Sequence, residues 1–141
     1  MTTILPAPIT GNARAAYLRT MLQVDGWSTG GFGIVLLAAG PLLHGPLGLP
    51  STWSIPFGIG MLGGAAALLL IAGYPDIPRE LALTVVAANT LSAAVMLVLV
   101  FVGAMPLTGW GIAFMLIGAA VVTAFAALEF IGLRRTLSLR P

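Results

Sequence analysis

Four long apolar runs alternate with short segments that hold prolines, glycines or charged residues. The runs cover about residues 16–43, 54–74, 77–103 and 108–135. A helix that rises about 1.5 Å per residue needs roughly 20 apolar residues to cross about 30 Å of hydrocarbon, and each run is long enough to do so. The pattern predicts an all-α membrane protein, an up-down four-helix transmembrane bundle in which residues 1–141 form a single domain.

The ends of these runs are predicted from residues that start or stop helices. Residues 1–12 lack apolar periodicity and are expected to form an arm, with Asn12 as the N-cap of the first helix. Gly40 and Pro41 are expected to end the first span, and Thr108 to cap the last one. Because the connections after the second and third runs are short, we expect spans two and three, and spans three and four, to be antiparallel neighbours.

The composition supports a membrane protein and narrows the chemistry that the chain can perform. Hydrophobic residues make up 59% of it and charged residues 7%, whereas soluble domains carry roughly 25% charged residues. The chain has no cysteine, which excludes disulfides and thiol catalysis, and its single histidine excludes a bis-histidine haem site within one chain. No nucleophile lies beside a base, so we predict no catalytic residue, no bound metal or cofactor, and a protein that is not an enzyme.

The arginines all fall in segments that four spans place on one side of the membrane. They precede the first span, lie between the second and third, and follow the fourth: Arg14, Arg19, Arg79, Arg134, Arg135 and Arg140. By the positive-inside rule both termini are expected in the cytoplasm, with Trp53 and Trp110 at the opposite interface. This topology explains the small positive net charge, so no nucleic-acid partner is predicted.

Small residues recur at the spacing that brings helices together in a membrane. Lipid gives apolar helices little reason to associate, so close backbone approach at small residues must supply the contact. The glycines that we expect at helix–helix contacts are Gly26, Gly30, Gly60, Gly64, Gly111 and Gly118. On the last span, Gly111, Gly118 and Glu129 share one stripe, which is expected to face protein.

Polar residues inside the spans are costly there and therefore informative. Asp25 and Glu129 lie near the cytoplasmic ends of the first and last spans, and Asn89 lies about 13 Å along the third span from Glu80. If these three spans are adjacent, the two acids and the amide converge. Arg19 is then expected to reach the acids from the cytoplasmic side.

Two interpretations of this polar cluster stay open. In the first, Glu129 pairs with an arginine and Asn89 forms a hydrogen bond to a neighbouring helix, so that the cluster fixes how the helices are aligned. In the second, the cluster lines a site for a lipid head group, a quinone or another small molecule, or a site for proton-coupled transport.

Three features of the chain carry a family resemblance. They are the approach to the first span from Arg19 to Asp25, the Asn89 of the third span, and an exit from the fourth span that reads Glu129-x-x-Gly132-Leu133-Arg134. In these features the chain resembles small four-span bacterial membrane proteins that carry no assigned activity. The resemblance covers most of the chain, and it implies an up-down four-helix bundle in the bacterial inner (cytoplasmic) membrane, with no particular chemistry.

The predicted function follows from these features. We expect a non-enzymatic bundle that acts through protein or lipid contacts, either as an accessory subunit or as a homo-oligomer, with membrane lipids around it. The alternative is a binder of small molecules, lipids or quinones, or a proton-coupled transporter, that uses the cluster of Glu, Asp and Asn.

Overall fold

Four helices make up the protein over residues 9–138, the part of the chain that the computed structural model describes. They are α1 (Ile9–Leu47), α2 (Ser51–Ala72), α3 (Arg79–Val102) and α4 (Gly109–Leu137). All four are long and apolar enough to cross a membrane. The predicted all-helical architecture is therefore confirmed, and its four candidate spans suggest a multi-pass membrane protein.

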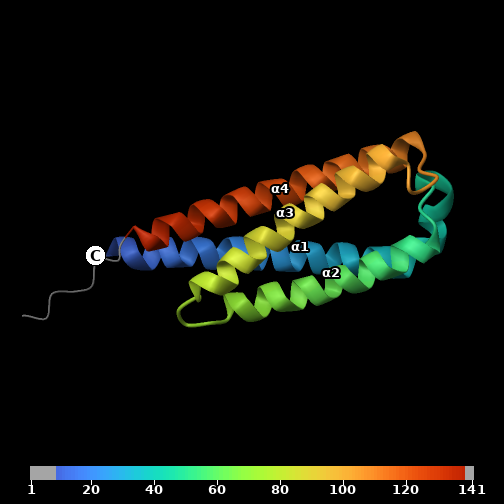
Figure 1. Ribbon diagram of the computed structural model, residues 1–141. Coiled ribbons are helices and arrows are strands. Elements are labelled where there is room, and N and C mark those ends of the chain that lie inside the picture. Colours follow the sequence, from blue (N-terminus) through green and yellow to red (C-terminus); the bar gives the residue numbers. More distant parts are fainter. Residues whose placement is uncertain (1–8, 139–141) are drawn as a thin grey trace, which may run out of the picture.

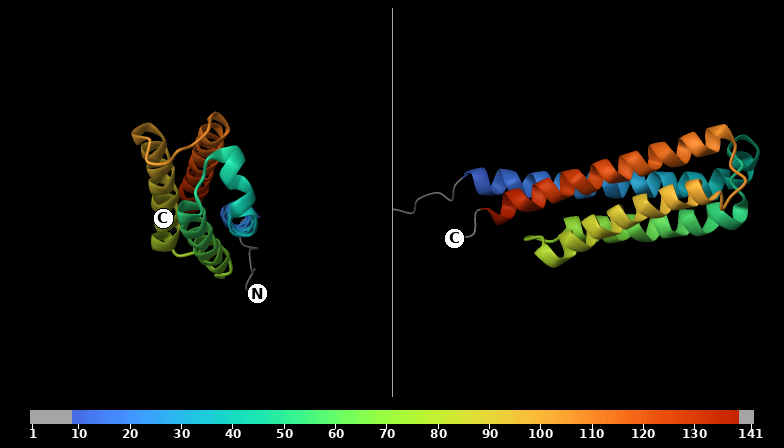
Figure 2. Two further views of the ribbon diagram at one scale, coloured as in Figure 1. Left: turned by 90° about the vertical axis from the view of Figure 1, so that its right-hand side faces the viewer. Right: turned by 45° about the horizontal axis from the view of Figure 1, so that its top comes forward.

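The helices are arranged as two pairs that are joined along α1 and α4. Figure 1 shows the chain reversing direction at each connection. The most extensive contacts are those of α1 with α2 and of α3 with α4, and contacts between α1 and α4 hold the two pairs together. The end-on view in Figure 2 shows these pairs side by side.

The contact between α2 and α3 is much smaller than the short connection between them predicts. These helices barely touch, so the prediction that they pack as neighbours is wrong. The same prediction for α3 and α4 is correct, because those two helices pack together. Residues 73–78 are instead held against α1, because Arg19 binds backbone carbonyl groups of Ala72, Tyr74 and Pro75. A connection bound in this way to a third helix need not bring its own two helices together.

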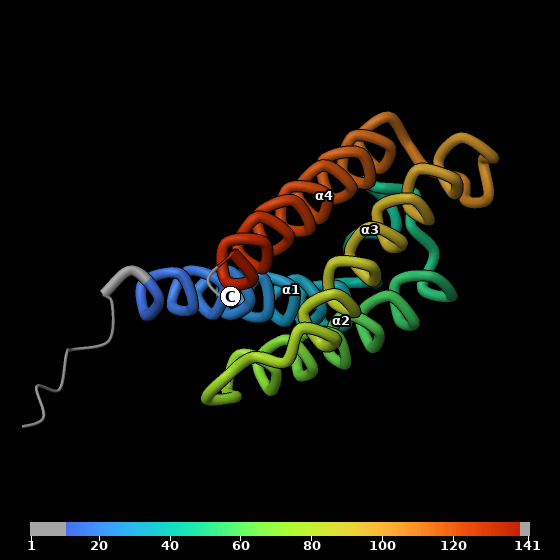
Figure 3. The backbone as a smooth tube through the Cα atoms, turned by 60° about the vertical axis from the view of Figure 1, so that its left-hand side comes forward, coloured from blue at the N-terminus to red at the C-terminus, as the bar shows by residue number. Residues whose placement is uncertain are grey.

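The first helix is longer at both ends than its sequence predicts. It already includes Ile9, so Asn12 lies inside the helix and is not its N-cap, and the rest of the predicted arm, residues 1–8, lies outside the described residues. At the other end the helix continues through Pro41 and Pro46 to Leu47. Its 39 residues span about 58 Å, nearly twice the thickness of the hydrocarbon. Figure 3 shows the first turns of α1 reaching beyond the connection between α2 and α3.

Contacts with Thr108 satisfy the carbonyl groups at the end of α1, just after its second proline. A proline removes one backbone donor and normally ends or kinks a helix. Here Thr108 donates its hydroxyl to the carbonyl of Pro46 at 2.6 Å and its N–H to the carbonyl of Leu47 at 3.1 Å. The last carbonyl groups of α1 are thus satisfied by another helix. The side chain of Thr108 also accepts from the N–H of Gly111, so its predicted role as the N-cap of α4 is confirmed.

Two apolar clusters fill the interior, one at each end of the molecule. The cluster near the described chain ends, here called the termini-end core, is formed by all four helices: Leu18, Leu22, Leu68, Ile71, Ala72, Ala82, Val85 and Leu133. The other, the far-end core, contains Leu36, Leu49, Met105 and Met115. The polar residues predicted to converge lie next to the termini-end core, towards the middle of the helices.

Candidate functional site

Asp25, Asn89 and Glu129 meet in the interior, each contributed by a different helix. Asp25 continues the buried stripe of α1 that begins with Leu18 and Leu22, and Glu129 lies on the buried stripe of α4. Asn89 lies on α3, four residues after the buried Val85. Apolar packing on three helices therefore carries the three polar side chains to one point, which we call the acidic cluster.

One amide group connects the two acids of the acidic cluster. The side-chain nitrogen of Asn89 donates to Oδ2 of Asp25 at 2.8 Å and to Oε2 of Glu129 at 3.0 Å. A primary amide carries two N–H groups, and both are used. Because both carboxyl groups bind the same nitrogen, their oxygen atoms are close neighbours.

The two carboxyl groups differ in how well their oxygen atoms are satisfied. Asp25 accepts at its second oxygen, Oδ1, from the hydroxyl of Thr29 at 2.9 Å. Glu129 has no partner at Oε1, although the side chain is only 1% exposed. Thr29 was not predicted from the sequence as a member of this cluster. It lies four residues after Asp25, however, and side chains at that spacing in a helix can interact.

Arg19 does not belong to the acidic cluster. Its guanidinium group donates to the carbonyl of Ala72 at 3.0 Å, of Tyr74 at 2.7 Å and of Pro75 at 2.8 Å. These carbonyl groups lie at and just after the end of α2, where a helix leaves acceptors without partners. The expectation that Arg19 reaches the acids did not allow for this competing set of acceptors.

The other arginines of the described chain also lie elsewhere. Arg14 donates to the carbonyl of Arg135 and to the hydroxyl of Ser138. Arg135 lies over the ring of Tyr17, and Arg134 over its neighbour on α4, the ring of Phe130. Arg79 is exposed at the start of α3. Over residues 9–138, then, neither carboxyl group of the acidic cluster has an arginine as an ion-pair partner.

Four of the six predicted packing glycines lie against another helix. A methyl group added to Gly26 would lie 3.0 Å from Leu69, and one added to Gly30 would lie 3.3 Å from Ala65. One added to Gly118 would lie 2.6 Å from the terminal methyl of Met96, and one added to Gly111 would coincide with the carbonyl oxygen of Leu47. Gly111 has no room for a side chain because it meets backbone, whereas at Gly26, Gly30 and Gly118 the neighbouring atoms belong to side chains, which would have to shift.

The other two, Gly60 and Gly64, face away from the rest of the chain. A methyl group added to either would meet nothing within 4 Å. The close approach of α2 to α1 occurs instead at Gly58 and Gly33, where a methyl group on either glycine would lie 3.0 Å from the carbonyl oxygen of the other. Spacing alone does not distinguish these faces, because residues two apart in a helix lie on opposite sides.

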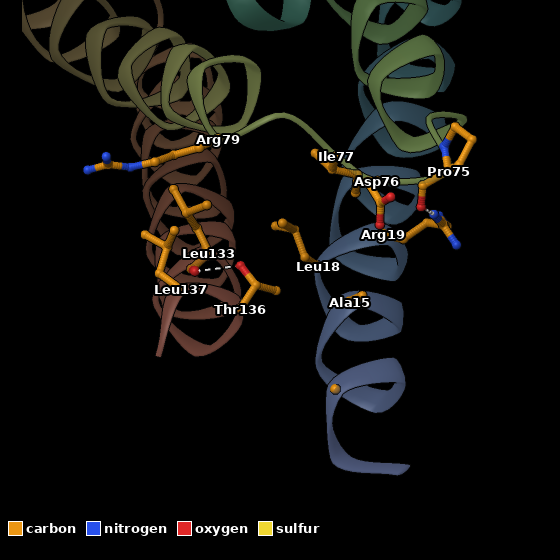
Figure 4. A pocket seen from close by; sticks show the side chains of 11 residues that line it. Ala15, Leu18, Arg19, Pro75, Asp76, Ile77, Arg79, Leu133, Thr136 and Leu137 are labelled. Atoms are coloured by element: carbon orange, nitrogen blue, oxygen red, sulfur yellow. Dashed lines mark hydrogen bonds between the residues drawn. The ribbon is translucent and has the colours of Figure 1, made fainter. Parts of the chain in front are cut away.

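A shallow pocket of about 190 Å³ opens at the termini end of the molecule (Figure 4). Leu18, Ile77, Leu133 and Leu137 contribute its apolar lining. In Figure 4 the guanidinium group of Arg79 points away from the other labelled side chains. The pocket does not include the acidic cluster, since Leu18 and Leu133 are buried between the two.

The acidic cluster offers two carboxyl groups, one amide and one hydroxyl, and so can accept hydrogen bonds and hold a proton. No nucleophile–base pair is found among these side chains. Comparisons of the chain with protein-family models, with characterised proteins and with solved structures found no match. The acidic cluster and the outer surfaces of the helices are therefore the features that bear on function.

Proposed function

We propose that this chain is a non-enzymatic, up-down four-helix membrane bundle that acts through contacts in the membrane, and that its partner is a second copy of itself. The supporting observation is the outer face of α2. Gly60, Gly63 and Gly64 lie there with open space beside them, and Ala67 continues the same face. We call these four residues the small-residue face.

The glycines of this face weaken α2 without a compensating contact inside the chain. Glycine in a helix interior is less favourable than alanine by about 1 kcal/mol. At Gly58 that cost is offset, because the glycine allows the backbones of α2 and α1 to approach closely. At Gly60, Gly63 and Gly64 no contact within residues 9–138 offsets the same cost. A partner helix packed against these glycines would offset it.

Self-pairing is favoured by the spacing within the small-residue face. Gly60 and Gly64 are four residues apart, the spacing at which two identical membrane helices can cross in close contact. A two-fold axis through this face would place the same glycines of both copies against each other. Membrane lipids would cover the remaining outer apolar surface, which includes Ile59 and Leu70.

The distribution of charge supports an orientation with both termini in the cytoplasm, and the bacterial inner membrane is the location that the sequence resemblance implies. Arg14, Arg19 and Arg135 lie where the described ends of α1 and α4 meet, and Arg79 starts α3 at that same end. Trp53 and Trp110 are near the opposite end, at the starts of α2 and α4. Both features agree with a cytoplasmic termini end. Cysteines placed at Gly45, which is exposed with nothing within 4 Å, and at Asp76 should therefore be labelled by a membrane-impermeant reagent from the periplasmic and cytoplasmic sides, respectively.

The oligomeric state in lipid nanodiscs tests the proposed contact. We expect a dimer for the unmodified protein by native mass spectrometry or single-molecule photobleaching. Gly60→Leu and Gly64→Leu together should convert it to a monomer. Gly31→Leu is the matched control, since Gly31 is an exposed glycine of α1 that also has nothing within 4 Å, and it should leave the dimer intact.

Either of two outcomes would contradict the proposal. One is an unmodified protein that is monomeric, and the other is a dimer that survives both leucine substitutions. A different membrane protein recovered in fixed ratio on the same face, in place of a second copy, would make the chain an accessory subunit.

A second candidate function is a small-molecule or lipid binder, or a proton-coupled transporter. The observation that favours it is the meeting of Asp25, Asn89 and Glu129 with no arginine of residues 9–138 beside them. The structural interpretation paired Glu129 with an arginine and had Asn89 form a hydrogen bond to a neighbouring helix. Asn89 does bond to two other helices, but no arginine of residues 9–138 pairs with Glu129.

A further inference from the structure

We infer that Asp25 and Glu129 together hold one exchangeable proton, which makes the acidic cluster a proton-binding site inside the membrane. This inference does not depend on the proposed dimer. It rests on the number of hydrogen-bond donors in the cluster, on the charges around it, and on its burial.

The donors are too few for two ionised carboxylates. Asn89 supplies two N–H groups and Thr29 supplies one hydroxyl, so three donors face four carboxyl oxygen atoms. Asp25 accepts at both of its oxygens, and Glu129 accepts at Oε2 only. A buried carboxylate oxygen without a donor is costly, whereas protonation neutralises the group and gives it an O–H that can donate to the neighbouring carboxylate of Asp25. The geometry therefore suits an ionised Asp25 beside a neutral Glu129.

Charge leads to the same assignment. Within the described chain, the titratable groups facing the cluster are Asp25 from α1 and Glu129 from α4, while α3 contributes the neutral Asn89. Residues 51–72 of α2 contain no titratable side chain. With both acids ionised, two negative charges would share one amide in a site that excludes water and lacks a cation. Binding one proton neutralises one of the two carboxylates, which removes the repulsion between them.

Burial requires a structural change before this proton can exchange. Asp25 is 2% exposed and Glu129 1% exposed. Towards the termini end, buried leucines separate the acidic cluster from the shallow pocket of Figure 4. They are Leu18 and Leu133, which also line that pocket, and Leu22. The distance from Arg19 to Asp25 along α1 is only about 9 Å, so this is the short route to water. Exchange through it needs α1 and α4 to separate at these leucines, and the repulsion that follows loss of the proton favours such a separation.

Infrared spectroscopy of the full chain in nanodiscs tests the inference directly. The carbonyl stretch of a protonated carboxyl group is separate from the bands of a carboxylate. We expect this band in the unmodified protein at neutral pH, and we expect it to disappear as the pH is raised. Glu129→Gln should abolish it. Glu80→Gln, which removes an exposed acid in the first turn of α3, should leave it unchanged.

A folded unmodified protein without this band at neutral pH overturns the inference. So does a band that persists in folded Glu129→Gln. If this variant fails to fold, the unmodified protein and Glu80→Gln still decide the matter, because the band should be present in both at neutral pH and should disappear from both as the pH is raised. The result is read on a monomer or a dimer alike, so its failure is distinguishable from failure of the self-association test.

Discussion

The far end of the molecule and the acidic cluster join the same two helices, α1 and α4, in different ways. At the far end, Thr108 satisfies the last carbonyl groups of α1 and at the same time caps α4. At the acidic cluster, a buried carboxyl oxygen of Glu129 has no partner. Polar groups that are fully paired account for stability, whereas a shortage of donors in the interior points to something that the site still has to bind.

The far-end contact can be broken most strongly at Gly111. Even one methyl group there would coincide with the carbonyl oxygen of Leu47, so Gly111→Leu must push α1 and α4 apart. We expect a loss of about 3–4 kcal/mol in the free energy of unfolding, measured by denaturation in mixed micelles. Gly109→Ala is the control, because Gly109 has open space beside it, and it should change the stability by no more than about 0.5 kcal/mol. Equal effects of the two variants would mean that the close contact is absent in the membrane.

The acidic cluster can be broken at its shared donor. Asn89→Leu removes both hydrogen bonds to the acids and leaves them buried, which should cost about 2–3 kcal/mol in the same measurement. Lowering the pH should recover part of this loss, since protonation relieves the unpaired charge. Thr90→Val changes the next residue, which is exposed and binds only its own helix, and should be close to neutral. A neutral Asn89→Leu would show that the amide does not bridge the acids.

A smaller effect is expected when the cap of α4 is removed. Thr108→Ala deletes the hydroxyl that accepts from Gly111 and donates to Pro46. Loss of an N-cap costs about 1 kcal/mol, and the freed carbonyl lies near the membrane surface, where water can replace part of the bond. Thr108→Ser should retain nearly full stability, and an equal loss in both variants would argue against the hydroxyl contacts.

The smallest change in stability is expected for Glu129→Gln. This variant also tests most directly whether the acidic cluster differs from the far end by holding a proton. The amide is nearly the same size as the acid and removes the charge, so stability at neutral pH should change by less than about 1 kcal/mol. The dependence on pH should differ more. If the folded protein keeps a proton that the unfolded chain gives up, the unfolding free energy of the unmodified protein falls as the pH rises. The variant should lose this slope, and a slope that persists would place its origin in another group.

Much of this fold could be predicted from the sequence because hydrophobic length in a membrane translates directly into spans. The helix ends could not. Pro41 and Pro46 read as stops, yet α1 continues to Leu47, where Thr108, more than 60 residues away in the chain, binds the last two carbonyl groups. Likewise, the short connection between α2 and α3 gave no sign that Arg19 holds it against α1.

The acidic cluster was predictable in part for a similar reason. Asp25, Asn89 and Glu129 could be brought together on paper because each continues a stripe of small or apolar residues. The place of Arg19 could not be predicted, since carbonyl groups at a helix end compete with carboxylates for its donors, and only the three-dimensional arrangement decides between them. The glycines show the same limit, because Gly60 and Gly64 have the spacing of a contact while Gly58 makes one.

The position of Arg19 has an electrical consequence for the acidic cluster. Arg19 binds the carbonyl groups just after α2, and in the proposed topology it marks the level at which α2 leaves the hydrocarbon. Asp25 lies about 9 Å beyond that level, roughly a third of the way through about 30 Å of hydrocarbon. Moving one charge through the whole membrane is worth about 2.3 kcal/mol per 100 mV. A proton that arrives from the termini end would therefore cross only a minor part of the transmembrane voltage, and one that arrives from the far end would cross most of it.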